Sequence, residues 1–407
     1  MIKYLLSLSL FLSQVFTLAS DKPNFLIILT DDQSWVGTSL LMDPDNPDSK
    51  SDYYQTPHID KLMQRGMRFT NGYSSGAWCV PSRRCIQSGQ STSRHIYNEA
   101  ADQNEAAFAK IQSMPKILKS VNADYRCAHF GKWHLKYPSV TPETLGYDVS
   151  DGDTDNSHGE MAYQLGFKGE ATPKDTPDVW EDPKMALDLS QRTGDFIEEQ
   201  SKAGNPWMVQ LSQYAVHLKI SYLQSTYDAL NDRPKGEKHA VQEFAAMTQD
   251  MDRAIGQLID RLETIGALDN TYIIFLSDNG GRGAMPVVGK PESNSEQGRN
   301  YPLAGSKHSI YEGGLRVLFS ISGPGIAEAS INHTPIGGVD ILPTVADLAG
   351  FEGKFNKQVD GGSFKGLAFG ETEKVNRSVP FLVFHSKGGE APRTAKQKKK
   401  GKQAFKA

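Results

Sequence analysis

The chain has 407 residues, of which 38% are hydrophobic, and this is enough to build a large buried core. Its formal net charge of −4 gives no overall attraction to nucleic acid, so we expect no nucleic-acid partner. Three cysteines without a Cys-x-x-Cys pair exclude a disulfide-dense scaffold and argue against structural zinc.

The N-terminal segment, residues 1–20, has the pattern of a secretory signal peptide. Lys3 supplies a positive charge, residues 4–18 are largely apolar, and Ala19 and Ser20 are small residues typical of a cleavage site. The apolar stretch is too short for a comfortable membrane span, and no later segment approaches about 18 apolar residues. We expect an exported protein, periplasmic or secreted, without stable membrane insertion. The alternative interpretation is a buried first helix.

Short continuous apolar runs predict strands that are buried on both faces of a sheet. Apolar residues at helical spacing predict helices between them, and the helix that begins at Thr56-Pro57 is expected to end at Gly66. Strands that alternate with helices indicate an α/β fold with a mostly parallel sheet. The predicted strands are 25–29, 206–211, 272–276 and 317–321, and the other predicted helices are 251–265 and 339–349.

Two of the predicted strands are followed by acidic and amide side chains. Asp31 and Asp32 follow the first strand, and Asp278 and Asn279 follow the strand over 272–276. A single Asp after a strand is more often a turn or cap residue, but ligands of parallel sheets bind beyond the carboxyl ends of the strands. Carboxylate and amide oxygens are hard ligands that suit Ca²⁺, or alternatively Mg²⁺, rather than zinc. The pattern predicts a cation site at this edge.

The segment 79–83 reads Cys-Val-Pro-Ser-Arg and resembles the signature of the sulfatase family. The resemblance implies that a formylglycine-generating or anaerobic sulfatase-maturating enzyme oxidises Cys79 to Cα-formylglycine. It also implies an alkaline-phosphatase-like fold, with a large mixed, mostly parallel sheet flanked by helices. Further segments in family order carry the resemblance, namely 24–32, 56–60, 131–135, 277–281, 305–307 and 311–317.

The resemblance implies a role for each matching position. Arg83 would hold the formylglycine diol, and Lys132 and His134 match the pair in Gly-Lys-Trp-His, with His134 taking a proton when sulfate is released. His217 with Lys307 would protonate the leaving alcohol. The implied metal ligands are Asp31, Asp32, Cys79, Asp278 and Asn279, and the implied catalytic residues are Cys79, Arg83, Lys132, His134, His217 and Lys307.

The chain also departs from the family pattern. Residues 84–90 differ from the usual second half of the signature, and His217 is followed by Leu218-Lys219 rather than by the usual His-x-Pro pattern. Residues 139–185, rich in Asp, Gly, Pro and Thr, are expected to form a long loop over the site. Residues 380–385 are expected to form one strand of a reduced C-terminal subdomain.

These observations predict four parts of the chain and one activity. After the signal peptide come a catalytic domain over 21–350, a truncated C-terminal subdomain over 351–395 and a basic, disordered tail over 396–407. The expected activity is hydrolysis of sulfate esters of a sulfated carbohydrate or an aryl sulfate. One alternative is a phospho- or phosphonate-ester hydrolase of the same superfamily, and the other is an inactive glycan-binding relative.

Overall fold

The computed structural model describes residues 22–94, 101–160, 181–283, 300–355, 359–380 and 382–384. The predicted signal peptide (1–20) and basic tail (396–407) lie outside these residues. Among the described residues, the largest feature is a sheet of eight strands. In spatial order they are β5 (Val149–Ser150), β4 (Arg126–Gly131), β6 (Trp207–Ser212), β1 (Asn24–Thr30), β7 (Thr271–Ser277), β8 (Phe319–Ser322), β2 (Met67–Phe69) and β9 (Ser330–Asn332).

The sheet is mixed but mostly parallel, as the sequence predicts. The five strands from β5 to β7 run parallel to one another, whereas β8 runs antiparallel to both β7 and β2. A separate two-stranded pair joins β3 (Gly72–Tyr73) to β10 (Ile336–Gly337). The carboxyl ends of β4, β6, β1 and β7 therefore meet at a single edge of the sheet.

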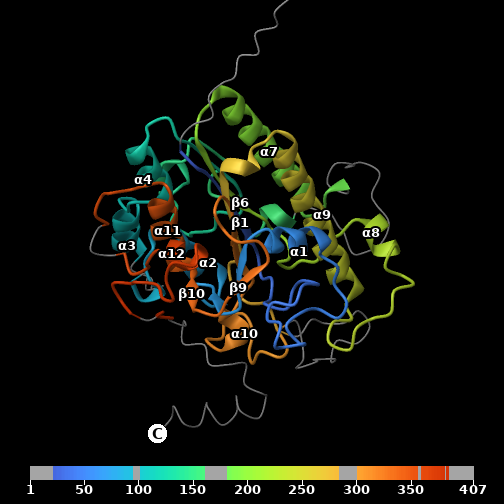
Figure 1. The fold of residues 1–407 in the computed structure, drawn as a ribbon. Helices are drawn as coiled ribbons and strands as arrows, with labels where there is room; N and C mark the ends of the chain where they lie inside the picture. The colour runs from blue at the N-terminus through green and yellow to red at the C-terminus, as the bar shows by residue number, and fades with distance from the viewer. Residues whose placement is uncertain are drawn as a thin grey trace, which may run out of the picture.

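Helices cover both faces of this sheet (Figure 1). One face carries α1 (Pro57–Gln64), α7 (Ala186–Ala203), α8 (Gln224–Asp228) and α9 (Gln242–Thr264). The other carries α2 (Cys79–Ser88), α3 (Ala101–Phe108), α4 (Met114–Val121), α11 (Ile341–Leu348) and α12 (Lys365–Ala368). The other short helices among the described residues are α10 (Glu312–Leu315) and the 3₁₀ helices Thr92–Arg94, Glu143–Leu145, His158–Glu160, Leu268–Asn270 and Gly338–Asp340.

The central strand β1 shows why the sheet needs a helical layer on each side. Leu26 and Ile28 pack into the core beneath α7 and α9, while Phe25, Ile27 and Leu29 pack into the core beneath α4 and α11. All five side chains are completely buried. An uninterrupted apolar run can be a strand only where both faces are covered.

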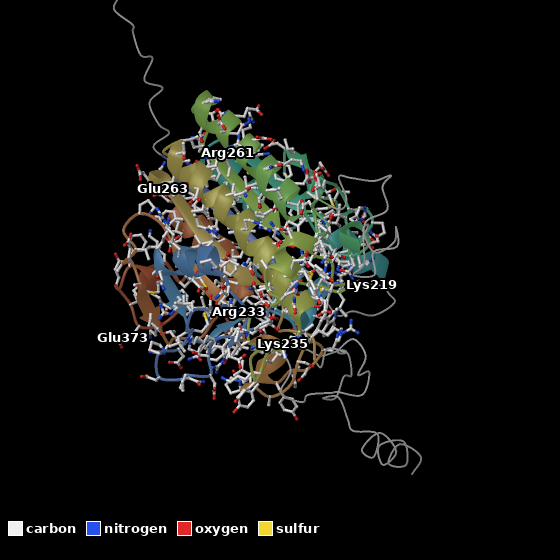
Figure 2. The ribbon with its side chains drawn as sticks, turned by 90° about the vertical axis from the view of Figure 1, so that its right-hand side faces the viewer. Lys219, Arg233, Lys235, Arg261, Glu263 and Glu373 are labelled. Atoms are coloured by element: carbon white, nitrogen blue, oxygen red, sulfur yellow. The ribbon has the colours of Figure 1, made fainter. Side chains whose placement is uncertain are left out.

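The outer helices α7 and α9 lie side by side across one face (Figure 2). Their contact includes an ion pair in which Arg261 of α9 meets Asp195 at 2.8 Å and also binds Glu198, both on α7. Figure 2 shows Arg261 and Glu263 on the exposed side of α9. The apolar sides of both helices face the sheet, which is the usual arrangement for amphipathic surface helices.

Most predicted elements are present, with shifted bounds. The strands at 25–29, 206–211 and 272–276 are β1, β6 and β7, and the predicted strand at 317–321 begins two residues later as β8. The helix predicted over 251–265 starts earlier, at Gln242. Two elements have no clear local signal: β4, which Arg126 and His129 interrupt with polar side chains, and α7, whose Gly194 packs against Arg261.

Two expectations about irregular regions are wrong in the described residues. The segment 139–185 is not simply a loop, because β5 extends the sheet by pairing with Ala128 and His129 of β4. Residues 382–384 form no strand. They pack through side chains instead: the Phe384 ring lies 5.9 Å from that of Tyr73.

None of the helices in the described ranges is both long enough and apolar enough to cross a membrane.

Candidate active site

The four parallel strands β4, β6, β1 and β7 bring the predicted site residues to one edge. The register aligns Leu29 with Ser212 and Thr30 with Ser277, so the residues that follow each strand emerge at the same level. The site residues that follow these strands are Asp31 and Asp32 after β1, Asp278 and Asn279 after β7, Lys132 and His134 after β4, and His217 after β6.

Cys79 is the first residue of α2 and lies among these side chains. Its Sγ is 3.4 Å from Asp31 Oδ1, 3.4 Å from Lys132 Nζ and 3.2 Å from Lys307 Nζ. Burial, followed by the charges of Asp278 and Asp31, raises the pKa of the Cys79 thiol well above its ordinary value. An unmodified Cys79 is therefore a neutral thiol rather than a nucleophilic thiolate.

Arg83, one turn along α2, connects two of the strand ends. Its Nε and Nη2 atoms each lie 2.9 Å from Asp278 Oδ2, and its Nη1 donates to the carbonyl of Lys132. Asp278 Oδ1 accepts a hydrogen bond from the Asp32 backbone at 3.2 Å. Burial and the Asp31 charge raise the pKa of Asp278 to about 6.

Asp31 and Asp32 each pair with a lysine. Lys132 forms an ion pair with Asp31, and Lys307 Nζ lies 2.6 Å from Asp32 Oδ1. Burial alone would raise the pKa of Asp31, but the charges of Lys132 and Arg83 outweigh it and hold that pKa well below its usual range. Both carboxylates are thus charged, which a bound cation requires.

The residues present fit a divalent cation. Asp32 Oδ2 and Asn279 Oδ1 are buried oxygens with no hydrogen-bond partner among the described residues. Ligand atoms of Asp31, Asp32, Cys79 and His217 lie within 4.8 Å of one another. Unpaired buried oxygens cost free energy unless something binds them, and hard oxygens suit Ca²⁺ or Mg²⁺. His217, which the sequence analysis assigned to proton transfer, thus also lies beside the cation ligands.

The two predicted histidines are neutral; His134 is buried and His217 is part-buried. His217 Nδ1 contacts the carbonyl of Leu218, its Nε2 lies 3.8 Å from Asp32 Oδ2, and burial lowers its pKa to about 4. Burial, with the charges of Lys132 and Arg83, lowers the pKa of His134 to about 2. The Nδ1 of His134 has no hydrogen-bond partner among the described residues.

Thr154 supports the site, although it is not among the predicted site residues. Its carbonyl accepts the His134 N–H at 2.8 Å, and its Oγ1 accepts the Trp133 N–H at 3.0 Å. The same hydroxyl donates to the Gly131 carbonyl. Thr154 is one threonine in a segment rich in polar residues, so nothing in its local sequence signals this role.

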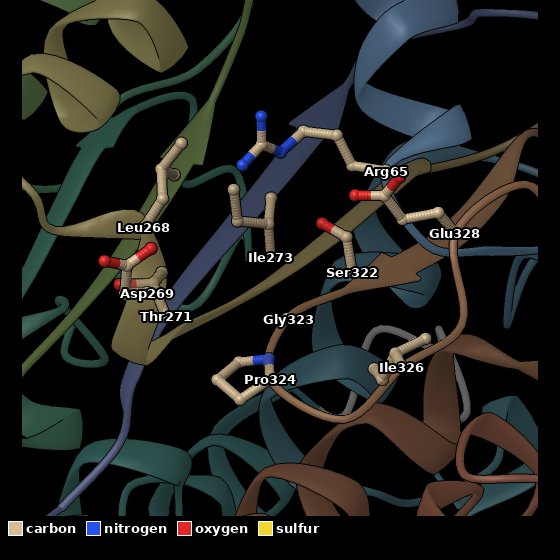
Figure 3. A pocket seen from close by; sticks show the side chains of 10 residues that line it. All are labelled: Arg65, Leu268, Asp269, Thr271, Ile273, Ser322, Gly323, Pro324, Ile326 and Glu328. Carbon is tan, nitrogen blue, oxygen red and sulfur yellow. The ribbon is translucent and has the colours of Figure 1, made fainter.

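A hollow lies at the opposite edge of the sheet, away from the candidate active site (Figure 3). It has a volume of about 210 Å³ and is lined by the start of β7 and the end of β8, including Thr271, Ile273 and Ser322. Arg65 extends over Ile273, and Asp269 lies beside Thr271 (Figure 3). This hollow lies at the other end of the strands from the residues around Cys79, so it does not belong to the candidate active site.

The fold and the site together fit a hydrolase of charged esters: an α/β sheet whose strand ends gather buried carboxylates and the cationic side chains of Arg83, Lys132 and Lys307 beside Cys79. The Sulfatase family model matches residues 23–351. The chain therefore belongs to the sulfatase family and is a sulfuric ester hydrolase.

Known proteins resemble the chain over most of its length. A sulfatase of Formosa agariphila is 27% identical over 401 residues, which covers 82% of this chain and 69% of the relative. N-acetylgalactosamine-6-sulfatase of Homo sapiens is 25% identical, covering 84% of this chain and 65% of the relative. The structure of BT4656 in complex with its substrate D-glucosamine-2-N,6-O-disulfate shares the fold, with a TM-score of 0.63, 18% identity, and coverage of 91% of this chain and 85% of that chain.

Proposed function

We propose that this sulfatase hydrolyses sulfate esters of a sulfated carbohydrate or aryl sulfate, using a formylglycine made from Cys79 and a bound Ca²⁺. The position of Cys79 carries the proposal. Its side chain lies between two lysine ammonium groups, at 3.4 and 3.2 Å, and beside the carboxylate of Asp31. Cations aimed at one reacting position are what stabilisation of a sulfate group and its transition state requires.

The modified residue would supply the nucleophile, and the cation would activate the sulfate group. A hydrated formylglycine offers two hydroxyls: one oxygen attacks sulfur as the bond to the leaving alcohol breaks, and deprotonation of the other re-forms the aldehyde and expels sulfate. The cation, when bound, polarises the sulfuryl group and acidifies the attacking hydroxyl. The residues that would hold it are Asp31, Asp32, Asp278 and Asn279, together with residue 79.

The chain's own side chains would handle charge and protons. Arg83 orients the diol, and Lys132 and Lys307 face the oxygens of the sulfate group. His217 with Lys307 delivers a proton to the leaving alcohol. His134, whose Nδ1 is unpaired among the described residues, accepts the proton of the second hydroxyl.

The relatives support a carbohydrate substrate, and the N-terminal sequence supports export. One relative is named for N-acetylgalactosamine 6-sulfate, and the BT4656 structure holds a disulfated glucosamine. The signal-peptide pattern of residues 1–20 supports export to the periplasm or the medium. A maturating enzyme is then a necessary partner, because Cys79 has to be oxidised before the enzyme can work.

Two measurements test the proposal. Mass spectrometry of the peptide that contains residue 79 distinguishes cysteine from formylglycine, and turnover of nitrophenyl sulfate is compared with that of nitrophenyl phosphate and phosphonate esters. We expect formylglycine and a clear preference for sulfate. An unconverted Cys79 without turnover would instead indicate an inactive glycan-binding relative, and a preference for phosphorus esters would indicate the other hydrolase class.

A further inference from the structure

Arg84 has no role in the mechanism described above, yet its side chain is buried beside the site. The residue is 3% exposed and follows Arg83 on α2. Its Nε donates to the carbonyl of Leu135 at 2.8 Å, and its Nη2 donates to the carbonyl of Lys136 at 3.3 Å. The guanidinium carbon lies 3.5 Å from the centre of the Tyr137 ring. All three contacts go to one short segment after β4.

That segment, residues 132–137, has a backbone that needs to be held in place. His134 and Lys136 adopt φ angles of 53° and 55°, in the left-handed region that residues with a Cβ rarely occupy. Such a conformation persists only where surrounding contacts determine it. Leu135, whose carbonyl Arg84 binds, lies between the two strained residues.

The two adjacent arginines of α2 bind opposite ends of this segment. Arg83 binds the carbonyl of Lys132 at the start of the segment, and Arg84 binds the carbonyls of residues 135 and 136 at its end. Residue 79 lies one turn earlier on the same helix. The helix that carries the nucleophile is thus joined through both arginines to the segment that carries His134.

We propose that Arg84 is a positioning residue, which fixes His134 relative to residue 79 by clamping the 134–136 backbone. The inference rests on the proposed function, because His134 is the proton acceptor there. Only a guanidinium can donate along two directions while its flat face lies on an aromatic ring. A lysine would keep the positive charge at this position but would lose the second donor and the stacking.

The test compares Arg84→Lys with wild type, both co-expressed with a maturating enzyme. Formylglycine content is measured by mass spectrometry, and turnover of nitrophenyl sulfate is expressed per formylglycine. We expect kcat to fall about tenfold or more with KM within about twofold, since displacing a catalytic group by about 1 Å costs up to a hundredfold. We also expect faster backbone hydrogen exchange confined to residues 132–140. In Arg84→Ala, added guanidinium should restore part of kcat.

Arg126→Lys is the matched control, because Arg126 is exposed at the start of β4. It should leave kcat, KM and hydrogen exchange unchanged. The inference is overturned if Arg84→Lys keeps wild-type kcat per formylglycine, if the loss appears in KM alone, or if exchange rises throughout the protein. Failure of the proposed function looks different, because wild-type enzyme carrying formylglycine would then fail to turn over the sulfate.

Discussion

Cys79 and Cys85 both lie on α2 and are both buried, but their surroundings differ. Cys79 is in contact with Asp31 and two lysines, whereas the Sγ of Cys85 makes a weak contact of 3.9 Å with the carbonyl of Ser75. We expect Cys79→Ala to abolish turnover of nitrophenyl sulfate and Cys85→Ala to retain most of it. Equal losses in two variants with unchanged melting temperatures would show that residue 79 is not the nucleophile precursor.

Asn279 allows a test of the cation site that does not depend on turnover. Its Oδ1 is buried without a hydrogen-bond partner among the described residues, while its Nδ2 donates to Asp32 Oδ1 at 2.7 Å. Chelated wild-type protein should gain melting temperature when Ca²⁺ is added, because binding to the folded state stabilises it. For Asn279→Ala, we expect the required Ca²⁺ concentration to rise at least about tenfold. An identical Ca²⁺ response in both proteins would place the cation elsewhere, and parallel Mg²⁺ titrations identify the preferred ion.

At the scale of elements, β4 can end against β6 only because residue 131 is glycine. Gly131 has a φ of 91°, and a Cβ there would lie 2.0 Å from the Ser212 carbonyl oxygen. Gly131→Ala should lower the free energy of unfolding by at least about 3 kcal/mol and displace Lys132, with loss of turnover. Gly152→Ala is the matched control, since Gly152 has a φ of 78° but nothing lies within 4 Å of its Cβ position. We expect Gly152→Ala to lower the free energy of unfolding by about 1 kcal/mol, and urea unfolding measures both variants.

Helix α1 is capped from another helix rather than by its own sequence. The Thr56 side chain makes no cap bond, and the carboxylate of Asp252 on α9 accepts the N–H of Ile59 at 2.7 Å and that of His58 at 3.3 Å. Burial raises the pKa of Asp252 to about 7. Folding therefore favours protonated Asp252, and the stability that this provides is present near pH 4 and is lost as the pH rises through 7.

Asp252→Asn, which mimics the protonated acid, removes that dependence. We expect the free energy of unfolding of the variant, relative to wild type, to increase by on the order of 2–4 kcal/mol between pH 4 and pH 8. Urea unfolding of both proteins at several pH values measures it. A constant difference would mean that Asp252 is already ionised at acid pH.

At the scale of the whole molecule, a buried ion pair joins residues 359–380 to the part of the chain that matches the sulfatase family model. Arg377 Nη2 lies 2.7 Å from Asp340 Oδ2, with side-chain exposures of 8% and 0%. Arg377→Met leaves the Asp340 charge buried and should cost about 3 kcal/mol in urea unfolding. Lys365→Met removes a half-exposed pair with Asp347 and should cost less than about 0.5 kcal/mol. Similar costs for both variants would show that the C-terminal residues contribute little to the fold.

Much of this architecture could be predicted from local sequence. The apolar runs at β1, β6 and β7 identified strands buried on both faces, because that pattern is stable only between two helical layers. The polar residues after β1 and β7 indicated a ligand site, because parallel strands end at one edge. β4 and α7 could not be predicted in this way, because partners distant in sequence bury His129 of β4 and Gly194 of α7.

The sequence by itself determined the chemistry of the candidate site: which residues could become a nucleophile, hold a cation or carry charge. Only the tertiary structure decided how they meet. The contacts of Arg83 with Asp278, of Thr154 with His134 and of Arg84 with Leu135 join different parts of the chain. Such contacts depend on strand order and loop path, which a local pattern does not encode, because the free energy that selects them comes from packing the whole domain.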